Sequence, residues 1–158
     1  MKTIWMAALV TAALAGVSAG AAAQDVTYRK DIKPLFDAKC LGCHGAASPV
    51  LAEFLLDQKK YGAAMKGPRM DSYADMIALI GWPDTGAVMR RLDDGKSAGG
   101  KPGNMYQYLG SSDEERQKNL QVFKDWVGPG GWTLKRWEAR GNVPAISREE
   151  LEKIRVKY

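Results

Sequence analysis

The sequence predicts an all-α fold, and three observations lead to that prediction. Apolar residues recur three and four positions apart along most of the chain, which is the spacing of one helix face. Residues that cap helices precede several of these stretches. Glycine-rich segments separate them, and no stretch shows the apolar–polar alternation of a half-buried strand. About 135 residues follow position 23, a length that suits one compact domain.

The first predicted helix covers residues 31–44. Ile32, Leu35 and Phe36 stand at positions i, i+3 and i+4, so they share one face. Pro34 has no N–H to donate and is compatible only with the first turn of this helix.

The next two predicted helices begin at serine caps. Ser48, followed by Pro49 at the first helical position, begins a second helix. Ser72 begins a third, which ends at Trp82-Pro83. The apolar faces are formed by Leu51, Phe54 and Leu55 in the second helix and by Tyr73, Met76, Ile77 and Ile80 in the third.

A short helix and a loop follow. Asp84 or Thr85 caps a fourth helix that runs through Leu92. Residues 93–104 are rich in glycine and lysine, so we expect a loop without regular structure.

The longest predicted helix begins at a capping box formed by Ser112 and Glu115, and residues 128–131 end it. Its buried stripe consists of Leu120, Phe123 and Val127. A tail follows, in which we expect Trp132 and Trp137 to pack back on the domain. A last charged helix begins at a capping pair, Ser147 and Glu150.

Both cysteines and the only histidine of the chain lie in one motif, Cys40-Leu41-Gly42-Cys43-His44. C-x-x-C-H is typical of c-type haem attachment. The two thiols add across the haem vinyl groups, and the imidazole ligates the iron. On a helix, Cys40, Cys43 and His44 stand at i, i+3 and i+4, so all three side chains face the same side.

Two other roles for a C-x-x-C pair fit less well. A thioredoxin-like redox pair requires a neighbouring βαβ unit, which the sequence does not predict. A zinc site would need further cysteine or histidine ligands, and the composition provides none.

Residues 1–23 have the pattern of a secretory signal peptide. Lys2 supplies the positive charge, residues 4–17 form the apolar region, and Ala21-Ala22-Ala23 provides small residues for cleavage before Gln24. The alternative is an uncleaved anchor, since residues 4–23 are just long enough to span a bilayer. We expect cleavage and a periplasmic protein without stable membrane insertion. Export also places the thiols where an unligated pair would oxidise to a disulfide.

Charge and composition argue against several other functions. The net charge of +5 is not concentrated in a dense basic run, so we expect no nucleic-acid partner. No glycine-rich phosphate loop is present, and a nucleophile–histidine pair would need His44 itself. We expect a monomer.

The second axial ligand of the iron is restricted by the composition. With one histidine, ligation by two histidines of this chain is impossible, and a single motif excludes a second conventionally attached haem. Methionine is the usual alternative and raises the reduction potential. The candidates after residue 24 are Met65, Met70, Met76, Met89 and Met105. Met76 and Met89 lie in predicted helices, where packing is the simpler role. Met65, Met70 and Met105 lie in irregular segments.

Residues 26–128 resemble the class I cytochromes c, which are small all-α electron carriers. Phe36 stands four residues before Cys40, where that family has an aromatic residue. Met105 follows Pro102-Gly103 about sixty residues after His44 and precedes the 112–127 helix, as the ligand methionine does in the family. The resemblance implies a helical domain over residues 24–128 around one covalently bound haem c, with Met105 as the sixth ligand. Residues 129–158 form an extension outside the shared pattern.

The function implied is that of a periplasmic monohaem cytochrome that carries single electrons between redox protein partners, and not that of an enzyme. One alternative is a dedicated haem subunit of a larger periplasmic or membrane oxidoreductase. Another is a haem enzyme or gas-binding protein with an open sixth position. Pocket walls would come from Phe36, Leu55, Ile77, Ile80 and Phe123, all of which also suit an ordinary core. Arg69, Arg90 and Arg91 are candidates to pair with the haem propionates, or else lie on a solvated face.

Overall fold

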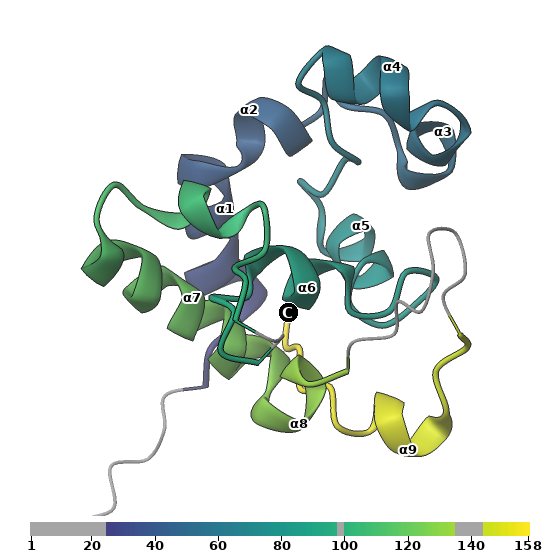
Figure 1. The fold of residues 1–158 in the computed structure, drawn as a ribbon. Coiled ribbons are helices and arrows are strands. Elements are labelled where there is room, and N and C mark those ends of the chain that lie inside the picture. The colour runs from purple at the N-terminus through teal and green to yellow at the C-terminus, as the bar shows by residue number, and fades with distance from the viewer. Residues whose placement is uncertain (1–24, 98–99, 135–143) are drawn as a thin grey trace, which may run out of the picture.

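The computed structural model describes residues 25–97, 100–134 and 144–158. The predicted signal peptide, residues 1–23, and Trp137 lie outside these ranges. Within them the chain forms helices joined by loops and contains no strand (Figure 1). The predicted all-α fold is therefore confirmed.

The N-terminal helical run is broken, whereas the sequence predicts one helix over 31–44. It consists of a π-helical turn and two α-helices: η1 (Tyr28–Ile32), α1 (Lys33–Lys39) and α2 (Leu41–His44). The run starts early because the Thr27 hydroxyl accepts a hydrogen bond from the Lys30 N–H and caps the first turn. It breaks at Cys40, whose backbone (φ −123°, ψ −22°) starts a new turn. Pro34 lies in the first turn of α1, as predicted.

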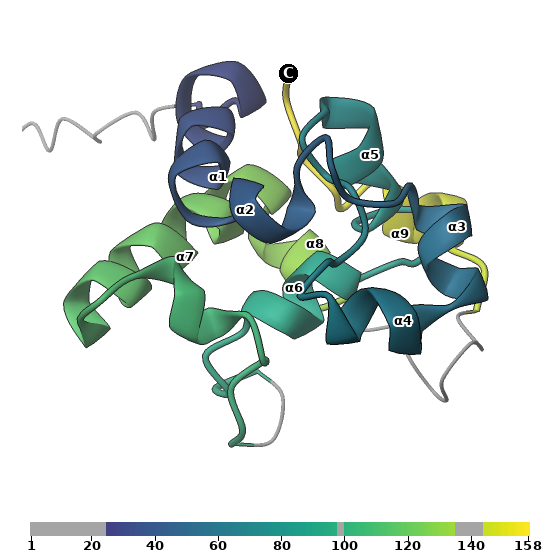
Figure 2. The ribbon, with the colours of Figure 1, turned by 90° about the horizontal axis from the view of Figure 1, so that it is seen from above.

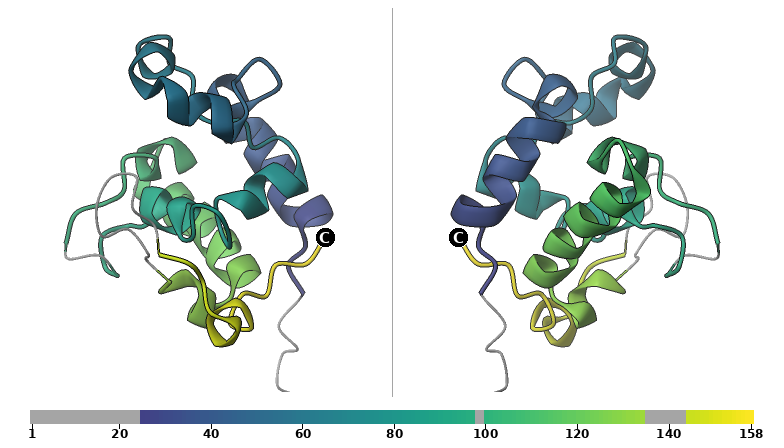
Figure 3. Two further views of the ribbon diagram at one scale, coloured as in Figure 1. Left: turned by 90° about the vertical axis from the view of Figure 1, so that its right-hand side faces the viewer. Right: turned by 90° about the vertical axis from the view of Figure 1, so that its left-hand side faces the viewer.

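The N-terminal run lies antiparallel to α7 (Asp113–Val127), the longest helix (Figure 3). At one end the ring centroids of Tyr28 and Trp126 are 6.1 Å apart. At the other end Lys39 Nζ lies 2.5 Å from the Glu115 carboxylate. Between these two contacts lies much of the core, which includes Ile32, Phe36, Leu120 and Phe123.

The second predicted helix, α3 (Leu51–Leu56), begins later than expected. Val50 is its N-cap, and Ser48 does not cap it. The Ser48 hydroxyl donates instead to the carbonyl of Cys43 at 2.8 Å, at the end of α2. This bond satisfies a helix-terminal carbonyl, so the serine that looked like the start of one helix closes the preceding one.

A helix that the sequence did not predict, α4 (Gln58–Ala63), follows α3 directly. Asp57 caps it by accepting a hydrogen bond from the Lys60 N–H at 3.0 Å. The α3–α4 pair lies across the molecule from α7 (Figure 2). Leu55, a predicted pocket wall, is 52% exposed on this pair.

The next helix, α5 (Tyr73–Ala78), confirms the predicted cap. The Ser72 hydroxyl accepts a hydrogen bond from the Asp75 N–H at 3.1 Å. Met76 is buried in α5, as predicted. The helix ends at Ala78 and not at Trp82-Pro83 as predicted, so Ile80, although buried, lies beyond it.

The predicted cap of α6 (Ala87–Leu92) is wrong. Its N-cap is Gly86, in the left-handed region at φ +81°, a conformation that glycine adopts without strain. Neither predicted cap is free for that role: the Asp84 carboxylate pairs with Arg90 at 2.6 Å, and the Thr85 hydroxyl donates to the Gly81 carbonyl.

The loop over residues 93–104 contains no helix in its described part, as predicted. A 3-10 turn that was not predicted, η2 (Tyr106–Leu109), connects it to α7.

The predicted capping box at the start of α7 is only half present. The Ser112 hydroxyl accepts from the Glu115 N–H, but the Glu115 carboxylate accepts from the N–H of Ser111 instead of Ser112.

The C-terminal extension packs against the helical domain. α7 ends where predicted, at Gly128 (φ +87°), but residues 129–132 continue as a short helix, α8 (Pro129–Trp132). Trp132 and Leu134 are buried in the core. The capping box of α9 (Arg148–Leu151) is present as predicted, with Ser147 and Glu150 bonded reciprocally.

The last residues of the chain return to its N-terminal end (Figure 3). The carbonyl of Lys157 accepts hydrogen bonds from the Tyr28 N–H at 2.8 Å and from the Trp126 indole N–H at 2.9 Å. The Tyr73 hydroxyl donates to the carbonyl of Val156 at 3.3 Å. Among the described residues, no helix is both long and apolar enough to cross a membrane.

Truncation after Gly128 should prevent stable folding. Burial of a large apolar side chain contributes about 1.5–3 kcal/mol, and a domain of this kind has a total stability of about 5–15 kcal/mol. Trp132 and Leu134 both contribute to the core, so their loss removes a large part of that stability. Circular dichroism with thermal unfolding measures this. Arg148→Gln, in a side chain that is 91% exposed, is the control and should change stability by less than about 0.5 kcal/mol. A truncated protein with an unchanged melting temperature would show that the extension is dispensable for folding.

Acid should weaken the contact between α1 and α7. The hydrogen bond from Lys39, and those from Ser111, lower the pKa of Glu115 from 4.5 to about 2. A carboxyl group with a depressed pKa in the folded state stabilises the fold above about pH 4.5, and this contribution is lost as the pH falls towards 2. Glu115→Gln should flatten the pH dependence of the unfolding midpoint in this range. Glu149→Gln, in exposed α9, is the matched control, and equal slopes in all three proteins would contradict the assignment.

Candidate haem site

The C-x-x-C-H motif forms one helical turn that ends in a buried histidine. The Cys40 carbonyl accepts hydrogen bonds from the N–H groups of Cys43 and His44, at 3.2 and 3.0 Å. The three side chains therefore keep the i, i+3, i+4 relation even though the helix breaks at Cys40. His44 is 9% exposed, and both cysteines are half-buried.

A loop over residues 66–70 is fastened along this turn. The Gly67 N–H donates to the Cys43 carbonyl at 2.9 Å, and the Met70 N–H donates to the His44 carbonyl at 2.9 Å. The Lys66 ammonium donates to the Gly42 carbonyl at 3.1 Å. A Cβ atom on Gly67 would lie 2.1 Å from the His44 ring, so only glycine lets the loop approach this closely.

The His44 imidazole is held in one orientation by the same loop. Its Nδ1 lies 2.8 Å from the carbonyl oxygen of Pro68. A carbonyl only accepts, so Nδ1 carries the hydrogen, and Nε2 is left with the lone pair that a metal ligand needs. Burial lowers the pKa of His44, the Pro68 hydrogen bond opposes this shift, and the positive charge of Arg91 adds to the lowering. The neutral, oriented ring fits the role of an axial ligand.

The two cysteines are not joined by a disulfide. Burial, with a smaller contribution from Cys43, raises the pKa of Cys40 to about 11. A redox-active or thiolate-forming cysteine would instead have a depressed pKa. In the described ranges, no three His, Cys, Asp or Glu side chains come together as a metal site. The thioredoxin-like and zinc interpretations therefore gain no support, while the residues present fit a covalently attached haem.

The five candidate methionines fall into three groups by their surroundings. Met76 and Met89 are buried in the core, in agreement with a packing role. Met65 is 65% exposed and has a positive φ of 55°. Met70 and Met105 are half-buried against the core, so these two remain as ligand candidates.

The loop before Met105 is anchored to the C-terminal end of α6. The Met105 N–H donates to the Arg91 carbonyl at 2.9 Å, and the Gly103 N–H donates to the Asp93 carbonyl at 2.8 Å. A Cβ atom on Gly103 would lie 2.3 Å from the carbonyl oxygens of Arg90 and Arg91, so the close approach requires glycine here. The backbone on which Met105 stands is therefore fixed to the core.

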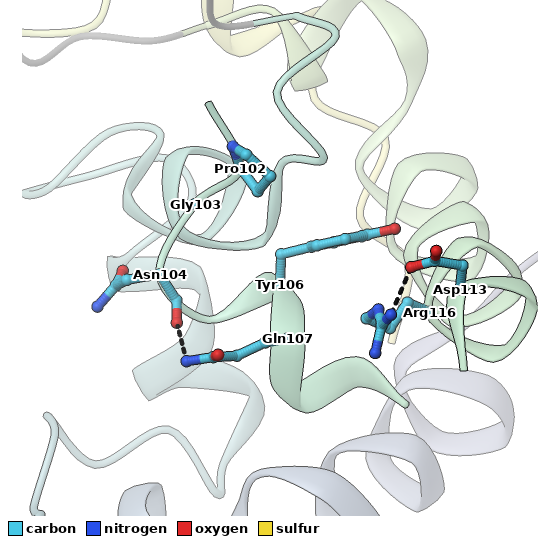
Figure 4. A pocket seen from close by; sticks show the side chains of 7 residues that line it. All are labelled: Pro102, Gly103, Asn104, Tyr106, Gln107, Asp113 and Arg116. Carbon is cyan, nitrogen blue, oxygen red and sulfur yellow. Dashed lines mark hydrogen bonds and ion pairs between the residues drawn. The ribbon is translucent and has the colours of Figure 1, made fainter. Parts of the chain in front are cut away.

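A pocket of about 450 Å³ lies on the outer side of this loop (Figure 4). The Tyr106 ring stands between the loop and Arg116 in this view, and its hydroxyl accepts a hydrogen bond from Gln117 at 2.8 Å. The pocket does not include the C-x-x-C-H motif. The residues that line it are Pro102, Gly103, Asn104, Tyr106, Gln107, Asp113 and Arg116.

The three arginines proposed as propionate partners differ in their surroundings. Arg69 pairs with Asp71 at 2.6 Å, and Arg90 pairs with Asp84. Arg91 pairs with no carboxylate of the described residues, and its guanidinium donates to the amide oxygen of Asn104 at 2.9 Å. Arg91 is also the one whose charge acts on His44. It is therefore the best placed of the three to meet an anionic group near the histidine.

Several residues of this site could not be found from the sequence. Gly67 and Pro68 were visible only as part of an irregular stretch, because their contact with His44 joins positions 23 and 24 residues apart. The burial of Asp93 could not be predicted either, because this residue lies in a segment that the sequence predicts to be a loop. The predicted pocket-wall residues Phe36, Ile80 and Phe123 are buried in the core.

Comparison with known proteins agrees with this geometry. The model of the PccH cytochrome c family matches residues 27–158. The solved structure of the monohaem cytochrome PccH from Geobacter sulfurreducens is similar, with 55% sequence identity and a TM-score of 0.73. That match covers 85% of this chain and 99% of the other. A comparison with curated protein sequences gives no match.

The expected resemblance to monohaem c-type cytochromes is thus confirmed, and the family match includes the extension as well as the helical domain. A monohaem cytochrome c binds one haem c covalently and generally acts as an electron carrier. The chain therefore belongs to the PccH cytochrome c family and is a monohaem electron-transfer cytochrome.

Proposed function

We propose that this protein is a diffusible periplasmic electron carrier in which Cys40 and Cys43 attach the haem and His44 and Met105 ligate its iron. The observation that carries the proposal is the neutral His44 imidazole, which Pro68 orients on the same helical turn as the two cysteines. When bound, the haem supplies reversible one-electron Fe(III)/Fe(II) chemistry. The partners are redox proteins, and the carrier is a monomer exported by its cleaved signal peptide.

The chain contributes rigidity and a low-dielectric surrounding. The loop over 66–70 holds the His44 ring through Pro68 and closes over it through Gly67. The loop before Met105 is bonded to α6 in a comparable way. Ligands held by such contacts stay in place in both oxidation states, so little rearrangement accompanies each electron transfer. The buried surroundings disfavour the additional positive charge of the oxidised centre.

The placement of Met70 supports Met105 as the sixth ligand. The Met70 N–H is bonded to the carbonyl of His44, and Pro68, two residues earlier, accepts from Nδ1. Met70 therefore belongs to the same loop that holds the imidazole at Nδ1. A sixth ligand must approach from the opposite face of the haem. Met105 is held next to Arg91, whose charge reaches His44 from a different element.

The environment of the extension favours a free carrier over a dedicated subunit of a larger enzyme. Exposed tryptophans in the tail would favour the subunit alternative, because exposed aromatic residues are common at interfaces. Trp132 is instead buried in the core of its own chain. Trp137 lies outside the described residues. A purified protein that is monomeric and exchanges electrons with unrelated carriers would support the free carrier, whereas co-purification with a catalytic chain would support the subunit.

Covalent attachment should depend on both cysteines. Denatured protein should keep its haem through acid–acetone extraction, and the reduced pyridine adduct should show one c-type haem per chain. Cys40→Ala and Cys43→Ala should each leave one thioether, and the double variant should lose its haem on extraction. Leu41→Ala, at the exposed position between them, is the control and should retain both thioethers. Extractable haem in the unmodified protein, or two haems per chain, would overturn this assignment.

His44→Ala should abolish ligation of the haem iron by a protein imidazole, since the sequence contains no second histidine. The absorption spectrum of the haem measures this loss.

Loss of Met105 should change the spectrum and the potential. A thioether ligand on ferric low-spin haem gives a weak charge-transfer band near the red edge of the visible spectrum. We expect this band in the unmodified protein and its absence in Met105→Ala. The reduction potential should fall by on the order of 100 mV, because methionine favours Fe(II).

Met70→Ala is the matched control for Met105→Ala, because Met70 is also half-buried and in a loop. It should keep the band and change the potential little. A band that survives Met105→Ala but disappears in Met70→Ala would reverse the assignment. A high-spin ferric spectrum in the unmodified protein would mean an open sixth position and would favour an enzyme or gas-binding protein.

A further inference from the structure

The C-terminal extension contacts both ends of α6. At the N-terminal end, the Leu134 carbonyl packs against Gly86 so closely that a Cβ atom there would lie 2.1 Å from the oxygen. At the C-terminal end, the Trp132 indole N–H donates to the Asp93 carboxylate at 3.1 Å. Both Trp132 and Asp93 are buried. Figure 1 shows α8, which carries Trp132, below α6.

The same end of α6 holds the loop that carries Met105. Helix-terminal carbonyls have no partner within their own helix, and here the loop supplies the partners. The Arg91 carbonyl accepts from the Met105 N–H, and the Asp93 carbonyl accepts from the Gly103 N–H. The Asp93 side chain bonds Trp132 with one oxygen and the Gly95 N–H with the other, at 3.1 Å. Asp93 thus joins the extension to both ends of this loop.

We propose that Trp132 is a positioning residue for the sixth ligand: through Asp93, the extension holds residues 93–95 and 103–105 in the arrangement that presents Met105 to the haem. This inference rests on the proposed role of Met105 as that ligand. Loss of a hydrogen bond to a buried carboxylate is costly, so removal of the indole N–H should loosen the contact between the extension and the loop. The extension would then determine how often Met105 leaves the iron, in addition to completing the core.

Exogenous imidazole measures this opening, because it binds ferric haem only when Met105 has left. Its apparent affinity is therefore proportional to the open fraction. Trp132→Phe keeps a buried aromatic ring but removes the N–H donor and part of the indole volume, a loss of volume that the control variant below shares. In the haem-loaded full-length protein, this variant should bind imidazole about tenfold more tightly than the unmodified protein.

The chain offers a matched control in Trp126→Phe. Trp126 is equally buried, and its indole N–H donates to the Lys157 carbonyl at 2.9 Å, away from the loop. The two variants should lower the denaturant midpoint by similar amounts. Imidazole affinity should stay within about twofold of the unmodified protein in Trp126→Phe. Equal increases in imidazole affinity in both variants would mean general destabilisation and would overturn the inference.

The reciprocal measurement needs no substitution. Because coupling between two sites acts equally in both directions, displacement of Met105 should loosen Trp132. Saturating imidazole should speed hydrogen exchange of the Trp132 indole N–H about tenfold and leave that of Trp126 unchanged. Unchanged exchange at Trp132 would overturn the inference even if Trp132→Phe failed to fold.

Met105→Ala separates failure of this inference from failure of the ligand assignment. If Met105 is not a ligand, Met105→Ala and the unmodified protein will bind imidazole equally, and both proposals fall. If Met105→Ala binds imidazole more tightly and Trp132→Phe does not, the ligand assignment stands and the positioning role of Trp132 is wrong.

Discussion

The hydrogen bond between His44 Nδ1 and the Pro68 carbonyl is the contact on which the site depends. It fixes the tautomer of the only histidine in the chain, so that Nε2 keeps the lone pair that a metal ligand needs. The loop can make this contact because Gly67 lets the backbone lie against the ring and because two further backbone bonds fasten it to the motif turn. A single short loop therefore provides the orientation of the imidazole that a haem protein needs.

The two sides of the proposed haem site are held in different ways. The histidine side is local: a helical turn and a loop exchange several backbone hydrogen bonds. The methionine side depends on α6, and α6 in turn is contacted by the extension at both ends. This difference in construction suggests why the chain is longer than a minimal cytochrome c. The additional residues complete the core through Trp132 and Leu134 and reach the loop that carries Met105 through Asp93.

Most ion pairs of the described residues join near neighbours in the sequence, and a few connect elements that are far apart in it. Lys39 and Glu115 join the end of the N-terminal run to the start of the longest helix. Arg90 and Asp84 brace α6 against the turn before it. Arg91 differs from these residues: its guanidinium donates to the side-chain amide of Asn104, and its positive charge lowers the pKa of His44. Arg91 is an exposed residue, but partial desolvation of its guanidinium and the charge of Arg90 lower its pKa, so an anion beside it would be favoured.

The sequence alone determined the fold class, the motif and most helix positions, because each of these depends on residues that are close together in the chain. Helical spacing of apolar residues, the caps at Ser72, Ser112 and Ser147, and the C-x-x-C-H motif are all local patterns.

Only the tertiary structure decided which polar groups form hydrogen bonds with one another. Ser48 closes α2 instead of opening α3, because its hydroxyl finds the Cys43 carbonyl. Asp93, in a loop by its composition, is buried because Trp132, 39 residues later, returns to donate a hydrogen bond to it. The packing of the helices determines hydrogen-bond partners of this kind, and residue spacing in the sequence does not predict them.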